Sequence, residues 1–144
     1  MDFGLAQYVS IAREPKEFAS GTLRYMAPEH FAGEALGPWT DVFALGSTFY
    51  EIVTGKRAMQ GKNLPEIRNH IINGSVDFEP LRDMPHGEAF ARFLAGALEK
   101  GREGRYADCS SMNEAFQLFL DEAGLSESAG SGGSSHSTID FLLR

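Results

Sequence analysis

Positive charge and long apolar runs are both scarce in this sequence of 144 residues. Lys and Arg total 13 against 20 Asp and Glu, which leaves a formal net charge of −7. Without a cluster of basic residues to bind phosphates, we expect no nucleic-acid partner. No segment approaches the roughly 20 apolar residues that cross a bilayer, and the first residues lack the basic start of a secretory signal. We therefore expect no membrane partner and a cytoplasmic location.

Cysteine and histidine are also too sparse to suggest a cross-link or a metal centre. Cys109 is the single cysteine, so an internal disulfide is excluded and nothing indicates an oxidising compartment. We expect this thiol to be small and partly buried. The histidines show no ligand spacing, and we expect surface or partly buried positions for His30, His70, His86 and His136.

Helical patterns dominate the middle of the chain, and alternating patterns typical of strands are missing. An apolar run over 41–53 predicts a helix buried on most sides, with Asp41 as N-cap and Gly55 beyond its last turn. Further helices are predicted from Pro65 to Ile72, Glu88 to Lys100 and Ser110 to Ala123. Residues 1–123 are therefore expected to form one mostly α domain.

The two ends of the chain differ from this helical middle. Residues 2–28 are interrupted by glycine and proline, which predicts an extended loop of the length that usually has a function. Residues 124–137 are rich in serine and glycine, which predicts a flexible linker. Residues 138–144 are apolar again. Two interpretations stay open for them: the start of a truncated following segment, or a disordered tail with chance apolar residues.

Four short motifs follow one another along the domain. They are Asp2-Phe3-Gly4, then Gly-Thr-Leu-Arg-Tyr-Met-Ala-Pro-Glu over 21–29, then 41–46 with 50–55, and finally 98–100 with Arg105-Tyr106. One tripeptide arises easily by chance, but four motifs in this order and spacing are specific. The set resembles the C-lobe of the protein kinase superfamily from its DFG motif onward, over residues 1 to about 123. Its style is similar to Ser/Thr kinases, the bacterial eukaryotic-like group in particular.

The resemblance assigns chemistry to the first motif. In the complete kinase, Asp2 would hold Mg²⁺ beside the ATP phosphates, since a hard cation prefers carboxylate oxygen. Phe3 would pack beneath the N-lobe, and Gly4 would give the loop its backbone freedom. Mg²⁺ and ATP are thus the implied cofactors, although we expect this chain alone to hold neither stably.

Other residues receive roles from the same resemblance. Thr22 would lie in the loop that receives the residue after the phosphoacceptor, where its hydroxyl orients the catalytic aspartate. Glu29, which follows Pro28, would form a buried ion pair with Arg105 that ties this segment to the last helices. Arg102 is a competing partner, but the spacing from 98–100 favours Arg105.

Asp41 and two serines complete the candidate residues. Asp41 would cap the backbone of the catalytic loop, and without that loop it is simply a helix N-cap. Ser10 and Ser20 are candidate phosphorylation sites, because a phosphate there could dock on arginines and order the segment. Each is also open to the alternative of an unmodified loop serine.

The sequence does not contain the remaining kinase signature. The Gly-rich loop, the β3 lysine with its helix-C glutamate and the His-Arg-Asp catalytic loop are missing from these 144 residues. We therefore expect an incomplete kinase C-lobe, without N-lobe and catalytic loop. In the complete protein it would transfer phosphate to Ser or Thr of protein substrates, whereas this chain alone would be inactive. The alternative is a non-catalytic protein-binding module.

The helix over 41–53 also leads to a prediction about surface. The helices after Glu88 can cover only one side of it, so an apolar patch should remain, with at least one of Phe43, Phe49 and Tyr50 unusually exposed. Such a patch favours self-association, binding of a partner, or a loosely packed state that binds the dye ANS.

Overall fold

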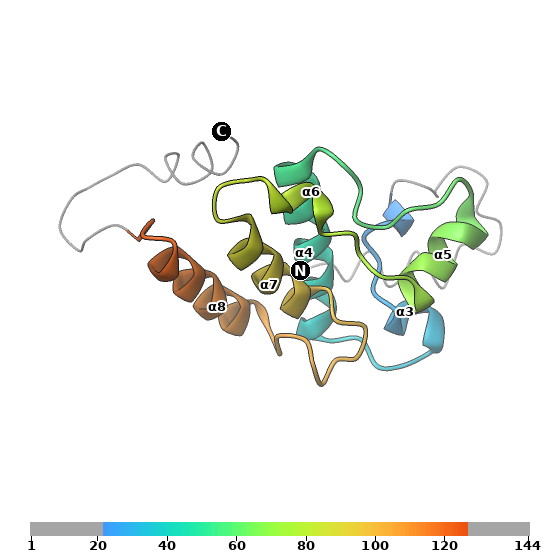
Figure 1. The fold of residues 1–144 in the computed structure, drawn as a ribbon. Helices are drawn as coiled ribbons and strands as arrows, with labels where there is room; N and C mark the ends of the chain where they lie inside the picture. Colours follow the sequence, from blue (N-terminus) through green and yellow to red (C-terminus); the bar gives the residue numbers. More distant parts are fainter. Residues whose placement is uncertain (1–21, 127–144) are drawn as a thin grey trace.

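The computed structural model describes residues 22–126, which form six helices and no strand. This confirms the prediction of a mostly α fold (Figure 1). The helices are α3 (Glu29–Ala32), α4 (Pro38–Thr54), α5 (Leu64–Asn73), α6 (Glu79–Arg82), α7 (Gly87–Ala97) and α8 (Cys109–Glu122). Helix α4 runs through the middle of the described fold. Helices α7 and α8 lie on one side of it, and α3 and α5 lie on the other side (Figure 1).

Helix α4 begins earlier than its apolar pattern predicts. Gly37 is the N-cap in extended conformation, and Pro38 occupies the first turn, where its missing N–H costs no hydrogen bond. The Thr40 hydroxyl accepts a 3.1 Å hydrogen bond from the Gly37 N–H. The prediction that Asp41 is the N-cap is therefore wrong, because Asp41 lies in the first turn. The predicted stop is correct, since Gly55 is left-handed with φ 70°.

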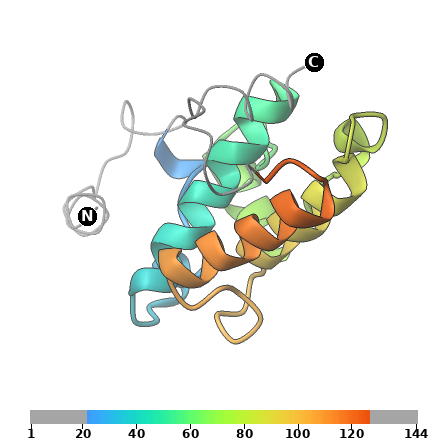
Figure 2. The same ribbon diagram turned by 90° about the vertical axis from the view of Figure 1, so that its left-hand side faces the viewer.

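Helices α7 and α8 lie side by side next to α4 (Figure 2), and an aromatic cluster joins α7 to α8. Phe93 of α7 lies with its ring centroid 5.3 Å from that of Phe116 in α8 and 6.4 Å from that of Phe119. Gly46 brings α4 close to α7, because an added Cβ would lie only 2.8 Å from the Ala97 Cβ. The predicted core face of α7 is confirmed, since its apolar residues are buried: Phe90, Phe93, Leu94, Ala97 and Leu98.

Helix α5 was predicted from the sequence, whereas the shorter helices α3 and α6 were not. The Asn63 side chain caps α5 by accepting a 3.0 Å hydrogen bond from the Glu66 N–H, and Ile67 and Ile71 are fully buried. The helix predicted from Pro65 to Ile72 is confirmed, and its sequence signals were Pro65 near the first turn and Asn73-Gly74 at the end. Helices α3 and α6 span four residues each, which is too short for a periodic pattern.

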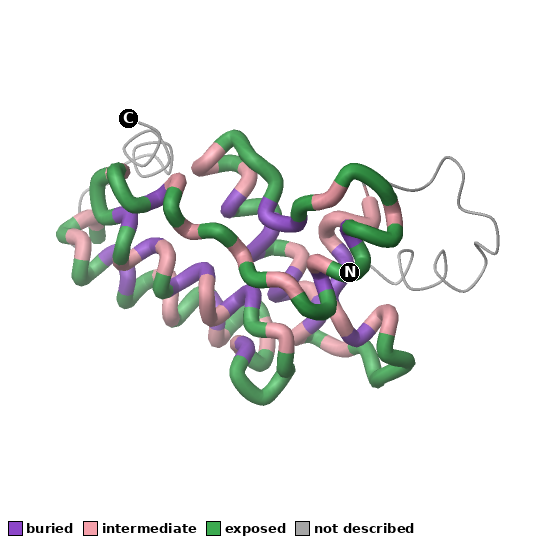
Figure 3. The backbone as a smooth tube through the Cα atoms, turned by 45° about the vertical axis from the view of Figure 1, so that its right-hand side comes forward, coloured by how far each residue is buried: buried purple, intermediate pink, exposed green. Residues whose placement is uncertain are grey.

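Buried and exposed positions alternate along the helices in Figure 3, and α4 keeps one apolar stripe exposed. Leu45, Phe49 and Ile52 expose 37%, 37% and 51% of their surface, and their spacing places them on one helix face. Phe43 and Tyr50, by contrast, are 0% and 2% exposed. Phe49 is thus exposed as predicted, whereas Phe43 and Tyr50 are not.

The loop after α5 explains the burial of Tyr50. The Tyr50 hydroxyl donates a 2.5 Å hydrogen bond to the Asp77 carbonyl, and its ring packs edge-on against Phe78 with centroids 6.3 Å apart. Burial, with the Asp77 charge as a smaller cause, raises the pKa of Tyr50 above 10.0. A segment that follows α4 by more than twenty residues therefore covers the side of α4 that its own sequence leaves open.

Two further expectations concern the burial of Cys109 and the absence of a membrane-spanning helix. Cys109, expected to be partly buried, is exposed because it is the first residue of α8 and lies beyond its packed turns. Asp108 precedes it as the N-cap, accepting a 2.8 Å hydrogen bond from the Ser111 N–H. Within 22–126, no helix has the length and apolarity that crossing a membrane requires.

Candidate functional site

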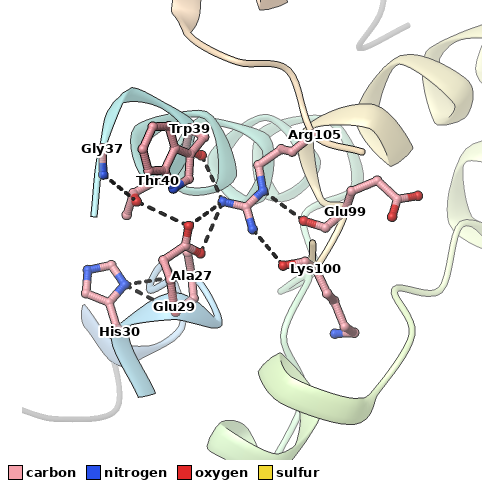
Figure 4. A network of polar contacts seen from close by, with 9 residues as sticks. All are labelled: Ala27, Glu29, His30, Gly37, Trp39, Thr40, Glu99, Lys100 and Arg105. Carbon is pink, nitrogen blue, oxygen red and sulfur yellow. Dashed lines mark hydrogen bonds and ion pairs between the residues drawn. The ribbon is translucent and has the colours of Figure 1, made fainter. Parts of the chain in front are cut away.

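A buried ion pair joins the start of α3 to the segment between α7 and α8 (Figure 4). Glu29 follows Pro28 as the first residue of α3. Its two carboxylate oxygens accept hydrogen bonds of 3.1 and 2.9 Å from Nη1 of Arg105. The two side chains are only 4% and 0% exposed, so water does not solvate either charge. Glu29 and Arg105, the partners implied by the resemblance, thus lie in direct contact.

Arg105 also binds three backbone carbonyls around this pair. Its Nη1 donates to the Trp39 carbonyl at 2.9 Å, its Nη2 to that of Lys100 at 3.0 Å, and its Nε to that of Glu99 at 2.8 Å. The guanidinium carbon lies 5.0 Å from the centroid of the Phe43 ring. One side chain therefore holds the start of α3, the first turn of α4 and the segment after α7 together.

Thr40 extends the network to the N-terminus of α4. It is 8% exposed, and its hydroxyl donates a 3.2 Å hydrogen bond to Glu29 Oε2. Because Thr40 Oγ1 also accepts the hydrogen bond from the Gly37 N–H, Thr40 links the Glu29 carboxylate to the N-cap of α4. Sequence reasoning missed Thr40. The only signal was its position three residues after Gly37, where a side chain can bond back to the N-cap.

Arg102, the competing partner for Glu29, packs against Trp39 instead. Arg102 lies with its guanidinium carbon 4.7 Å from the centroid of the Trp39 ring, and it makes no contact with Glu29. Arg102 is exposed, whereas Arg105 is buried. The preference for Arg105 over Arg102 as the partner of Glu29 therefore agrees with the geometry.

Lys100 fixes the neighbouring helix from the same segment. Its Nζ donates hydrogen bonds of 3.2 and 2.7 Å to the carbonyls of His70 and Ile71, which belong to the last turn of α5. A cation at a helix C-terminus is favourable because the free carbonyls there carry partial negative charge. Burial lowers the pKa of Lys100 below 10.5. Lys100 and Arg105 together anchor α3, α4 and α5 to one short segment.

The segment from Thr22 to Ala27 is attached by two polar side chains. The Tyr25 hydroxyl donates a hydrogen bond to Glu51 in α4, and this bond raises the pKa of Tyr25 above 10.0. Arg24 donates to the carbonyls of Met59 and Gly61 at 2.6 and 3.0 Å. Thr22 is half-buried, and its carbonyl accepts a 3.1 Å hydrogen bond from the Tyr25 N–H.

The remaining predicted residues are not brought into this network. Asp41 is half-buried in the first turn of α4, and its charge helps to raise the pKa of the Cys109 thiol, after partial desolvation of this thiol as the main cause. The other predicted residues lie outside the described range: Asp2, Phe3, Gly4, Ser10 and Ser20. Across residues 22–126, no three His, Cys, Asp or Glu side chains lie together as metal ligands would.

Comparison of the sequence with known proteins identifies the family of this chain. Residues 1–117 match the model of the protein kinase domain. The chain is 30% identical over 127 residues to tyrosine-protein kinase MasK of Myxococcus xanthus, covering 85% of this chain and 19% of that protein. It is 33% identical over 103 residues to serine/threonine-protein kinase PknE of Mycobacterium tuberculosis, covering 72% of this chain and 18% of that protein.

A third relative is serine/threonine-protein kinase A of Synechocystis, which is 42% identical over 57 residues, or 39% of this chain and 11% of that protein. The chain therefore spans less than a fifth of the length of these three relatives. Because the kinase-domain match covers most of the chain, the chain belongs to the protein kinase family.

Proposed function

We propose that this chain is the C-terminal part of a protein kinase domain that phosphorylates Ser or Thr in protein substrates. The observation that carries the proposal is the anchoring of the 21–29 motif, whose Glu29 pairs with Arg105 of the last motif in the order typical of the family. The residues of the 21–29 motif support Ser or Thr as the phosphate acceptor. Two relatives named as serine/threonine kinases support the same acceptor. The relative named as a tyrosine kinase makes acceptor identity the first property to test.

Within this proposal the motif residues have separate tasks. Thr22 would hold the catalytic aspartate in orientation through its hydroxyl, next to the residue after the acceptor. Asp2 would hold Mg²⁺, and Phe3 and Gly4 would set the pose of that loop beside ATP. The metal, when bound, neutralises phosphate charge during transfer. Ser10 and Ser20 stay candidate modification sites.

The 144-residue polypeptide by itself is proposed to be inactive. It contains no His-Arg-Asp motif to supply the general base and no β3 lysine to hold the nucleotide phosphates, and the transfer needs both. Labelled phosphate should not enter protein substrates above the level seen with Asp2→Asn. Incorporation above that control, with protein free of contaminating kinases, would contradict the proposal.

The genomic sequence before the codon for Met1 offers the direct test of function. An in-frame stretch that encodes a β3 lysine and His-Arg-Asp supports the kinase, and the longer polypeptide can then be assayed. Phosphoamino-acid analysis of its product should give phosphoserine or phosphothreonine. Phosphotyrosine alone would refute Ser/Thr specificity.

The exposed stripe on α4 favours a second candidate, a non-catalytic protein-binding module. Leu45, Phe49 and Ile52 form one apolar face through which this chain would hold a partner or a second copy of itself. A stop codon and promoter directly before Met1 would support this module. Self-association measured by light scattering should weaken in Ile52→Lys. The control is Leu118→Lys, which changes a side chain that is 64% exposed on α8. Equal self-association of the two variants would exclude the stripe.

A further inference from the structure

Three positively charged side chains among the described residues have no bonded partner. Residues 22–126 contain ten Lys and Arg. Seven of them have partners: Arg82 and Arg92 pair with carboxylates, Arg105 with Glu29, Arg68 and Arg102 with aromatic rings, and Arg24 and Lys100 with backbone carbonyls. Of these ten Lys and Arg side chains, the three that make neither an ion pair, nor a hydrogen bond, nor a ring contact within residues 22–126 are Lys56, Arg57 and Lys62.

All three lie in one loop, residues 55–63, which connects α4 to α5. Arg24 holds this loop against the segment 22–27 through the carbonyls of Met59 and Gly61. Because those partners are neutral, the charge of Arg24 is not cancelled and adds to that of the loop. The charges of Arg24 and Arg57 both act on the Tyr25 hydroxyl, where they oppose the rise in its pKa. The loop thus brings its cations next to the segment that contains Thr22.

The carboxylates bonded within this surface do not balance the cations. Glu51 accepts the Tyr25 hydrogen bond, and Glu66 accepts a 2.7 Å hydrogen bond from the Lys62 backbone N–H. Within residues 22–126, this surface therefore has four cations and two bonded carboxylates, in a chain whose formal net charge is −7. Unpaired cations in an acidic protein attract acidic ligands locally, while the rest of the surface repels extended polyanions.

We propose that Arg24 and the loop residues Lys56, Arg57 and Lys62 form a docking surface for acidic side chains of the protein substrate, next to the segment that contains Thr22. This inference rests on the proposed function, in which Thr22 lies next to the residue that follows the acceptor. The preferred substrates carry Asp or Glu close to the acceptor hydroxyl. Arg57 and Lys62 are both exposed, so an incoming carboxylate can reach them without displacing a protein partner.

A binding experiment tests this surface on the 144-residue chain. The probe is a fluorescent peptide with a central serine followed by three glutamates, and the matched peptide carries glutamines in their place. At low salt the acidic peptide should bind about 3–10-fold more tightly by anisotropy, since exposed charge pairs each contribute modestly. The difference in affinity should disappear at about 0.5 M salt because exposed charges are then screened.

Charge-reversal variants locate the effect. Arg57→Glu combined with Lys62→Glu should remove the preference for the acidic peptide. Arg92→Glu, on α7 at the other side of α4, is the control and should keep it, as its side chain is 70% exposed. Circular dichroism should show the same helix content in all three proteins. Amide resonances in 22–27 and 55–63 should shift on titration with the acidic peptide and not with its glutamine form.

Three outcomes would overturn the proposal. They are equal affinity for the two peptides, an unchanged preference in the Arg57→Glu, Lys62→Glu variant, and equal binding of a single-stranded oligonucleotide of the same charge. The binding assay needs no phosphoryl transfer. A longer polypeptide that fails to phosphorylate Ser or Thr would therefore refute the proposed function. The binding assay would still decide whether the surface prefers the acidic peptide.

Discussion

Replacing Glu29 by glutamine probes the buried ion pair most directly. Glutamine keeps the size of the side chain but removes the negative charge opposite Arg105. The guanidinium then stays in a site where its side chain is 0% exposed, without a counterion. Its carbonyl partners on Trp39, Glu99 and Lys100 are retained and offset part of the loss.

The magnitude follows from burial. Breaking one partner of a buried pair costs about 3–5 kcal/mol, and the three retained carbonyls place Glu29→Gln near the lower end, at about 3 kcal/mol. Small domains have total stabilities of about 5–15 kcal/mol, so a large part of the fold's stability depends on this contact. Arg105→Met should cost at least as much, since it leaves the Glu29 carboxylate buried without a cation and three carbonyls without a donor.

Urea unfolding followed by far-ultraviolet circular dichroism measures the free energy of unfolding for each protein. Glu99→Gln is the matched control. It removes one negative charge from the same region, but its side chain is exposed and only its backbone carbonyl binds Arg105. The control should lie within about 0.5 kcal/mol of the original chain. A loss below about 1 kcal/mol for Glu29→Gln would refute the reasoning, because the pair would then be effectively solvated.

Three further changes test the packing and the titration of the fold. Gly46→Val should lower the free energy of unfolding by about 1–3 kcal/mol, because even a Cβ would lie 2.8 Å from that of Ala97; unchanged urea unfolding would show that the helices can separate. Ser47→Ala should be neutral or stabilising by up to about 1 kcal/mol, since the buried hydroxyl has no partner within 22–126, and a clear loss in thermal unfolding would contradict this. Tyr25, Tyr50 and Tyr106 all have a pKa raised above 10.0, so the native state keeps protons that the unfolded chain releases. The free energy of unfolding should therefore fall as pH rises from about 10 through the raised values, and Tyr50→Phe should flatten this slope; a slope that stays the same would exclude Tyr50 as a cause.

The sequence predicted the elements with local signals and missed those that depend on distant contacts. Helices α7 and α8 were predicted within about three residues of their ends, because their apolar positions recur at helical spacing over several turns. The start of α4 was placed too late. Asp41 is a good N-cap residue in isolation, whereas the actual cap uses Gly37 with Thr40 three residues on.

The candidate site divides in the same way. The Glu29–Arg105 pair was accessible from sequence only through family resemblance, since no local rule relates residues that far apart. Thr40 and the two carbonyl contacts of Lys100 were missed because they exist only after α3, α4 and α5 have packed. The burial of Tyr50 was missed for a similar reason, as the segment that covers it follows α5.

The ion pair has a consequence for how the chain folds. Glu29 and Arg105 are separated by 76 positions, so helices α4 to α7 lie inside the loop that their contact closes. Closing a loop of this length is slow, and burying either charge before the other arrives is unfavourable. Partly folded forms that contain only one of the two residues in its final place should therefore be sparsely populated. We therefore expect the start of α3 and the segment between α7 and α8 to reach their final places together.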